Sequence, residues 1–111
     1  MKLRELAKTL GLNVKTAKSV LEGEVTGGYA GDLLSDVLAN SKKGNIWITL
    51  QTHVNIVAVA SSKELSGIII VNGRIPEDET LKRAEEEKIP IMLTSLSAFG
   101  VICKLYELGV R

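Results

Sequence analysis

The chain has 111 residues, of which 45% are hydrophobic but only 4% aromatic, and its 14 basic and 13 acidic residues give a net charge of +1. This length fits one domain, most often ~100–150 residues, so we expect a single domain over 1–111 with an aliphatic core. The near-neutral charge argues against nucleic acid and anionic membranes as partners. One cysteine, Cys103, and one histidine, His53, exclude an internal disulfide and the usual zinc ligand sets.

The absence of two kinds of sequence pattern limits where the protein is located and what chemistry it performs. No apolar run approaches the ~18 residues of a membrane span and the first residues form no signal-peptide pattern, so we expect a cytoplasmic protein without membrane contact. Neither the P-loop motif nor the dinucleotide-binding glycine motif occurs, and no Cys–His or Ser–His–Asp spacing stands out. Cys103 falls in an apolar stripe and is expected in the core. We therefore expect no enzymatic activity and no cofactor.

The first third of the chain predicts one helix and then a segment of mixed character. Apolar residues at helical spacing from Leu3 to Leu10 predict a short helix that ends at Gly11. The segment 12–25 is ambiguous. Three glycines within 25–32 indicate a strand or loop there rather than a helix.

Helices and strands alternate from Asp32 onward. Asp32 is the expected N-cap of a helix that reaches Asn40. The apolar run 45–51 predicts a buried strand, and 67–71 predicts a strand covered on both faces.

The C-terminal third continues the alternation. Pro76 and an acidic first turn predict a helix over 76–88. A short strand is expected over 90–93, and Thr94 or Ser95 caps a final helix that stops at Gly109.

The segment 54–60 decides the topology. Its β-branched residues fit a strand that would form a hairpin with the preceding strand, while its alanines fit a buried helix. Because strands that alternate with helices argue for βαβ crossovers, we assign 54–62 as a helix. The expected fold is therefore an α/β domain of two or three layers with a mostly parallel central sheet.

Several residue strings together resemble one family. They are Glu24-Val25-Thr26-Gly27-Gly28-Tyr29, Asp32-Leu33-Leu34-Ser35-Asp36-Val37, Ile48-Thr49-Leu50-Gln51-Thr52-His53, Asn55-Ile56-Val57-Ala58-Val59-Ala60, Ile70-Val71-Asn72-Gly73-Arg74 and Leu96-Ser97-Ala98-Phe99. The chain resembles the DRTGG-domain proteins, specifically the small single-domain type often encoded near iron-hydrogenase and related redox genes. The family's Asp-Arg pair upstream of Thr-Gly-Gly is matched here to Glu22-Gly23, so no role of that arginine carries over.

The resemblance implies a fold similar to the N-terminal domain of HPr kinase/phosphorylase. Related domains occur beside CBS pairs in regulated pyrophosphatases and beside phosphotransacetylase domains, where they act in regulation or assembly without catalytic residues. It also implies a homodimer and a redox enzyme as a partner. The expected function is a regulatory or ligand-sensing module that binds a small anionic ligand or a partner protein.

Polar residues beside the predicted strands supply the candidate ligand-binding site. They are Thr26, Gly27, Gly28, Gln51, Thr52, His53, Asn55, Asn72, Gly73, Arg74, Thr94 and Ser95. The two glycines of Thr26-Gly27-Gly28 let a backbone approach a ligand and present amides to an anion, or else they form a bulge or tight turn. The residues after Leu50 open a helix, where Thr52 is an expected cap and free N–H groups suit a phosphate or carboxylate.

The loops after the last two strands complete this candidate site. Asn72-Gly73-Arg74 and Thr94-Ser95 each follow a strand, although such residues also serve as ordinary turns and caps. We expect all these loops to rim one polar depression at the carboxyl ends of the strands.

Two other functions remain open. Residues 3–23 resemble the helix-turn-helix of lactose-repressor-type proteins, with Lys15 and Lys18 on a recognition helix, which predicts DNA binding. The family match instead makes 12–18 a strand, and DNA binding would need more basic charge than the chain carries. The final helix is apolar over more than one stripe, and the helix that follows Asp32 adds a second apolar face, so a purely structural dimerisation domain is the third hypothesis.

Overall fold

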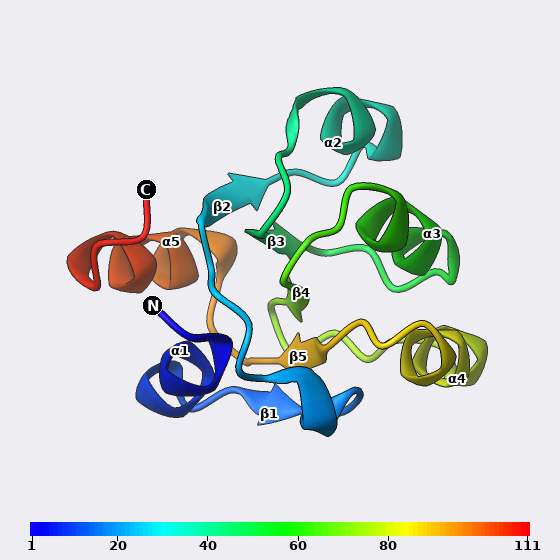
Figure 1. Cartoon of the computed structure of the whole chain (residues 1–111), viewed down its shortest axis with the longest axis horizontal. Helices are drawn as coiled ribbons and strands as arrows, with labels where there is room; N and C mark the ends of the chain where they lie inside the picture. Colours follow the sequence, from blue (N-terminus) through cyan, green and yellow to red (C-terminus); the bar gives the residue numbers. More distant parts are fainter.

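Four parallel strands form the centre of this protein, whose computed structural model describes all 111 residues (Figure 1). The helices are α1 (Leu3–Leu10), α2 (Leu34–Asn40), α3 (Asn55–Ser62), α4 (Asp78–Glu86) and α5 (Ala98–Glu107), with a 3₁₀ turn at Lys18–Val20. The strands are β1 (Asn13–Val14), β2 (Gly27–Ala30), β3 (Asn45–Thr49), β4 (Gly67–Ile70) and β5 (Ile91–Leu93). The helix predicted for 54–62 is confirmed as α3.

The strands lie in the order β1-β5-β4-β3-β2. Each neighbouring pair from β2 to β5 is parallel, and only the two-residue β1 runs antiparallel, against β5. The mostly parallel sheet predicted from the alternation of elements is therefore confirmed.

Helices cover both faces of the sheet, which makes three layers (Figure 1). The crossover helices α2, α3 and α4 lie on one face over a cluster that includes Trp47, Ile68 and Ile70. The helices α1 and α5 lie on the other face over a cluster that includes Ile48 and Ile69. Trp47 is fully buried and its Nε1–H donates to the carbonyl of Gly31 at 2.8 Å.

The helix-turn-helix predicted for residues 3–23 is wrong, because its second helix does not form. Residues 13–14 are extended and pair with β5, and the backbone N–H of Lys15 donates to the carbonyl of Ile91 at 2.8 Å. The hydroxyl of buried Thr16 donates to Ile89 O at 2.7 Å and accepts from the Ile91 N–H at 2.8 Å. The free edge of β5 therefore captures this segment, although β1 is much shorter than the strand expected over 12–18.

Three local predictions also need correction. Asp32 does not cap α2, because its carboxylate accepts hydrogen bonds from the Thr49 hydroxyl at 2.8 Å and the Leu50 N–H at 2.7 Å. The cap of α5 is Ser97, whose hydroxyl accepts from the N–H of Gly100 at 3.1 Å, rather than Thr94 or Ser95. Cys103 is exposed rather than in the core.

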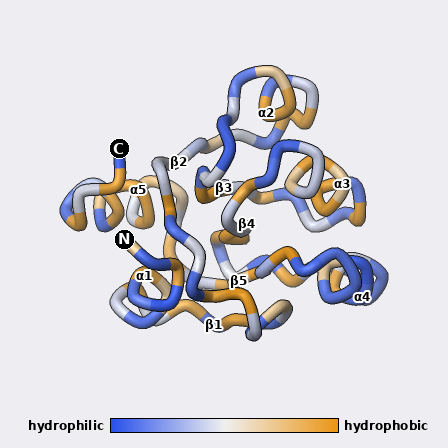
Figure 2. The backbone as a smooth tube through the Cα atoms, viewed as in Figure 1, coloured by the Kyte–Doolittle hydropathy of each residue, from blue (hydrophilic) through white to orange (hydrophobic).

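The surface of α4 is strongly hydrophilic (Figure 2). Its Glu85 and Glu86 are exposed, as expected for a solvated helix face, and α4 begins at Asp78, two residues after Pro76. No helix of the structure is long and apolar enough to span a membrane.

The bridge made by Thr16 leads to the first prediction. Thr16→Val leaves the Ile91 N–H and the Ile89 carbonyl without their partner in a buried place, so we expect a loss of about 2 kcal/mol in the free energy of unfolding. The control is Thr9→Val on the exposed side of α1, where we expect a change within ~0.5 kcal/mol. Urea unfolding followed by the fluorescence of buried Trp47 measures both, and equal midpoints for the two variants would contradict the prediction.

Candidate functional site

The structure divides the predicted site between two edges of the sheet. Thr26 lies directly before β2, and Gly27 and Gly28 begin that strand, so these residues lie at the edge where the parallel strands start. Gln51 and His53 follow β3 and lie at the edge where the strands end. The prediction that Thr26 and His53 share one depression is therefore wrong, because parallel strands place their first and last residues at opposite edges.

Polar groups after β3 are engaged in local hydrogen bonds. Gln51 Nε2 donates to the carbonyl of Asp32 at 2.8 Å, which ties this segment to the end of β2. The carbonyl of Thr52 accepts from the Thr80 hydroxyl at 2.8 Å, which ties it to α4. Thr52 does not cap α3: Val54 occupies the N-cap position, without a side-chain hydrogen bond. The Gln51 side chain and the Thr52 carbonyl therefore connect neighbouring elements.

His53 and Asn55 form one small turn. His53 is exposed, and its Nδ1 accepts a hydrogen bond from the backbone N–H of Asn55 at 3.2 Å. The amide that was expected to face a ligand is therefore satisfied by the histidine.

The loops after β4 and β5 do come together, as predicted from their common position after a strand. The N–H of Gly73 donates to the carbonyl of Thr94 at 2.9 Å. Gly73, Arg74, Thr94 and Ser95 line one hollow of about 220 Å³. Asn72 lines a separate hollow of about 250 Å³ beside the end of β2. The twelve predicted residues thus belong to several places and not to one.

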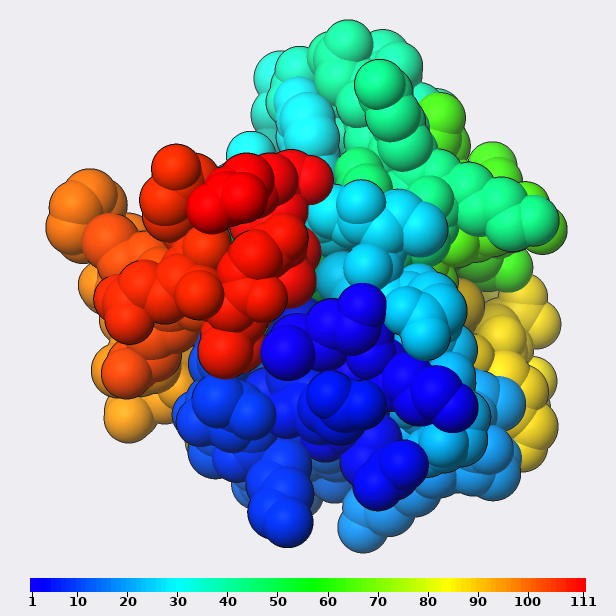
Figure 3. All heavy atoms as spheres, turned by 60° about the vertical axis from the view of Figure 1, so that its left-hand side comes forward, coloured from blue at the N-terminus to red at the C-terminus, as the bar shows by residue number.

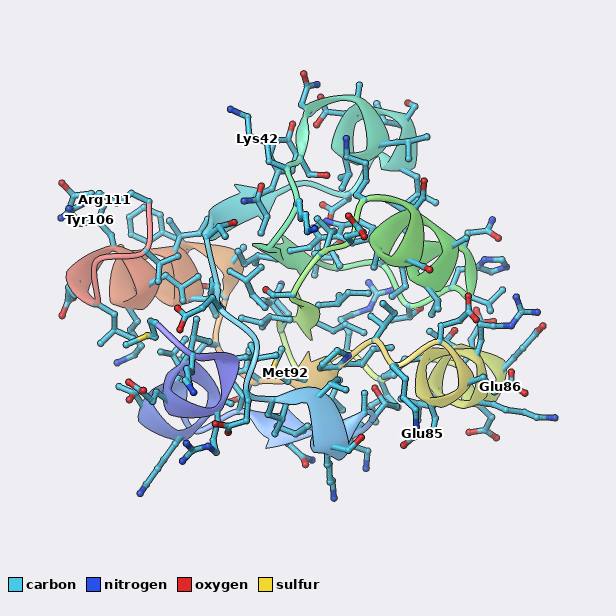
Figure 4. All side chains as sticks on the ribbon, in the orientation of Figure 1. Lys42, Glu85, Glu86, Met92, Tyr106 and Arg111 are labelled. Carbon is cyan, nitrogen blue, oxygen red and sulfur yellow. The ribbon has the colours of Figure 1, made fainter.

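A basic hollow of about 520 Å³ lies at the other edge, where β2 and β3 begin. Its lining residues are Thr26, Gly27, Gly28, Tyr29, Asn40, Lys42, Lys43, Asn45 and Arg111. In Figure 4, Lys42 lies at the loop between α2 and β3, and Arg111 lies beside the end of α5. Figure 3 faces this side, where C-terminal residues in red lie against the cyan atoms of β2.

The turn before β3 positions the two lysines at this hollow. Asn45 Oδ1 accepts from the backbone N–H of Lys42 at 2.9 Å, and Gly44 adopts a positive φ of 83° that closes the turn. The Thr26 hydroxyl donates to the carbonyl of Lys43 at 2.8 Å, and the Thr26 N–H donates to the carbonyl of Gly44 at 3.0 Å. Thr26 therefore holds the turn in place.

A glycine at position 27 is required by the C-terminal segment. A β-carbon added to Gly27 would lie 2.7 Å from the backbone oxygen of Arg111 and 3.2 Å from Asn45 Nδ2. Gly28 is exposed and leaves its backbone open to the hollow. Gly27 thus allows the C-terminal segment to pack closely, and Gly28 leaves the backbone of β2 accessible from the hollow.

Positive charge in the basic hollow is only partly neutralised. Lys43 forms an exposed ion pair with Glu64 at 3.5 Å, while Lys42 and Arg111 form no ion pair. The backbone oxygen of Arg111, the last residue of the chain, lies at this hollow beside Gly27, and the carboxylate of Asp36 is engaged by the lining residues Tyr29 and Asn40.

Asp36 is held by two hydrogen-bond donors. One is the hydroxyl of Tyr29 at 2.5 Å, and the other is Nδ2 of Asn40 at 2.9 Å. The hydrogen bond to Asp36, with burial second, raises the pKa of Tyr29 above its ordinary value. Tyr29 therefore stays neutral well above physiological pH and adds no negative charge to the hollow.

Sequence reasoning missed the three cationic residues of this hollow. The sequence predicts no ligand-binding role for Lys42, Lys43 or Arg111. Two lysines beside a glycine were the available signal, but only the pairing of β2 with β3 shows that the turn 41–44 lies next to Thr26. The residues before Thr26 also correct the family comparison: Glu24-Val25, and not Glu22-Gly23, stands directly where the name motif has Asp-Arg.

Comparison with known proteins supports the fold. No protein-family model and no curated protein sequence matches the chain. The chain is similar to a crystal structure of the CBS and DRTGG domains of the regulatory region of Clostridium perfringens pyrophosphatase, complexed with the activator diadenosine tetraphosphate. The TM-score is 0.70 at 16% identity, and the match covers 92% of this chain and 44% of the other. The chain thus has a DRTGG-like fold and spans under half the length of that regulatory region.

The contact between Gly44 and Thr26 leads to the second prediction. A β-carbon at Gly44 would lie 2.6 Å from Thr26 Cγ2 and 2.7 Å from its Oγ1, whereas one at Gly73 meets nothing within 4 Å. Both glycines have positive φ, so Gly73→Ala measures the backbone strain alone. We expect Gly44→Ala to lose about 1 kcal/mol more than Gly73→Ala, because Thr26 must also shift. Equal losses in chemical unfolding would show that Thr26 does not hold the turn.

Proposed function

We propose that this domain is a regulatory module that binds a small anionic ligand in the basic hollow and has no catalytic activity of its own. The observation that carries the proposal is the convergence of Lys42, Lys43 and Arg111 on one hollow of about 520 Å³. Two of these three cations lack an anionic partner within the chain. A bound phosphate or carboxylate supplies that partner.

The surroundings of the three cations suit an oxyanion. Charge-assisted hydrogen bonds from Lys and Arg to phosphate are short and strong, and Arg also binds with two parallel N–H groups. Asn45 Nδ2 adds a neutral donor, and exposed Gly28 lets the ligand approach the backbone. The hollow therefore offers both charge and directed donors.

The comparison supports the same class of ligand. The pyrophosphatase regulatory region whose fold this chain shares was crystallised with diadenosine tetraphosphate, a polyanion. A regulatory role by analogy with that protein is part of the proposal, as is the absence of catalysis. A redox enzyme as the partner of this domain stays a prediction from the sequence resemblance.

The third prediction tests anion binding with inorganic triphosphate as the probe. A ligand that binds only the folded state adds about 2.7 kcal/mol at 100 times its Kd, which raises the Tm by about 10 °C for a domain of this size. We expect Lys42→Ala to raise the Kd about tenfold, because one charge-assisted hydrogen bond is lost. Lys82→Ala is the matched control, since Lys82 is exposed on α4 and lines no part of the hollow.

Two results would contradict the proposal. One is an unchanged Tm of the wild-type protein with triphosphate at millimolar concentration. The other is a Kd for Lys42→Ala that equals the Kd for Lys82→Ala.

Self-association is a second candidate role, favoured by exposed apolar side chains on two helices. On α5, Phe99 is 78% exposed and Tyr106 is 60% exposed, while Leu33, directly before α2, is 69% exposed. Contiguous apolar surface of this kind usually marks an interface. A homodimer through the first turn of α5 would bury the ring of Phe99 against a second copy.

The fourth prediction tests the homodimer. We expect light scattering to give twice the monomer mass at tens of micromolar, and Phe99→Lys to restore the monomer because a charge would have to be buried in the contact. Leu33→Lys, directly before α2, is the comparison variant and should stay dimeric. A monomeric wild-type protein would refute the homodimer, and a monomer produced by Leu33→Lys alone would move the interface to α2.

A further inference from the structure

An apolar groove of about 230 Å³ lies between β2 and α5. Its lining residues are Gly28, Tyr29, Ala30, Ile48, Ile102, Leu105, Tyr106, Val110 and Arg111. The groove exists because the outer strand β2 carries small residues, Gly28 and Ala30, where a large side chain would fill the space against α5. Its volume is below the ~300–1,000 Å³ of a complete small-molecule pocket, so it suits one part of a ligand.

The apolar groove and the basic hollow are continuous. Gly28, Tyr29 and Arg111 line both of them. The guanidinium of Arg111 lies over the ring of Tyr106 in the groove, 4.4 Å from its centroid, while the backbone oxygen of Arg111 lies beside Gly27 in the hollow. Figure 4 shows Arg111 and Tyr106 together at the end of α5.

We propose that the apolar groove and the basic hollow form one bipartite site for a phosphate ester of a flat aromatic group, the chemical class to which nucleotides belong. This inference rests on the proposed anion binding and adds the apolar half of the ligand. The phosphates lie in the hollow near Lys42 and Lys43, and the aromatic ring lies in the groove.

The lining favours a ring over an alkyl chain. Tyr106 contributes aromatic surface, and the planar guanidinium of Arg111, which lies over its ring, also stacks on rings. Aliphatic atoms of Ile48 and Ile102 complete a slot in which a ring loses contact with water. An inorganic anion would leave this apolar surface exposed, so it should bind less tightly than the ester.

The experiment compares Kd values, by titration calorimetry, for the four nucleoside triphosphates, inorganic triphosphate and adenosine. For at least one nucleotide we expect a Kd about tenfold below that of inorganic triphosphate, because stacking of a base on an aromatic side chain contributes at this level. Adenosine alone should bind more weakly than either, because it lacks the groups that reach the lysines.

Two variants separate the groove from the hollow. Ala30→Leu fills the groove without touching the hollow, so it should raise the Kd for the nucleotide about tenfold and leave the Kd for inorganic triphosphate unchanged. Ile102→Ala removes apolar surface of the groove at a 42% exposed position and should act in the same direction, and it is the deciding variant if Ala30→Leu does not fold. Ala39→Leu, on the exposed surface of α2, is the control that should change neither Kd.

The outcomes distinguish this inference from the function on which it rests. Equal Kd values for triphosphate and every nucleotide would overturn the bipartite site and leave anion binding in place. Groove variants that weaken both ligands equally would also overturn it. Binding of neither ligand would overturn anion binding and the bipartite site together.

Discussion

The parallel pairing of β3 with β4 in the middle of the sheet is the constraint on which the rest of the structure depends. Two parallel strands that follow each other in sequence need a crossover, and α3 supplies it. Alternate residues of β3 then face two separate cores: Trp47 packs under the crossover helices, while Ile48 packs under α1 and α5. Both faces must therefore be covered, and the two ends of the chain provide the second cover.

This constraint also explains what could be predicted from the sequence. The unbroken apolar run of 67–71 and the alternation of strands with helices were sufficient to place α3 and the sheet. Hydrogen bonds to distant backbone were not predictable. Asp32 has the pattern of a helix cap, but its carboxylate is taken by the end of β3, and Thr16 serves a strand 75 residues away. Strand order determines such contacts, and periodicity carries no information on strand order.

The residues of the candidate site could not be grouped from the sequence for the same reason. Glycine is unfavourable in strands, so the sequence leaves strand and loop open for Gly27-Gly28, which the structure shows to be the start of β2. This start of the strand places Thr26 at the opposite edge of the sheet from His53. The partners of Thr26 come instead from the turn at Lys43 and Gly44, which local sequence could not associate with it.

The net charge of the whole chain does not describe the charge around the candidate site. A net charge of +1 gives no general attraction for anions, yet the turn before β3 and the end of the chain place three cations around one hollow. The single ion pair among them, Lys43 with Glu64, is exposed on both sides and contributes roughly 0–1 kcal/mol. In the proposed site, Lys43 would exchange an exposed ion pair for a phosphate at little cost, while Lys42 and Arg111 have no ion pair to give up. Thr26 holds the turn that carries the lysines and the C-terminal segment packs on Gly27, so the proposed binding would require little ordering of the chain.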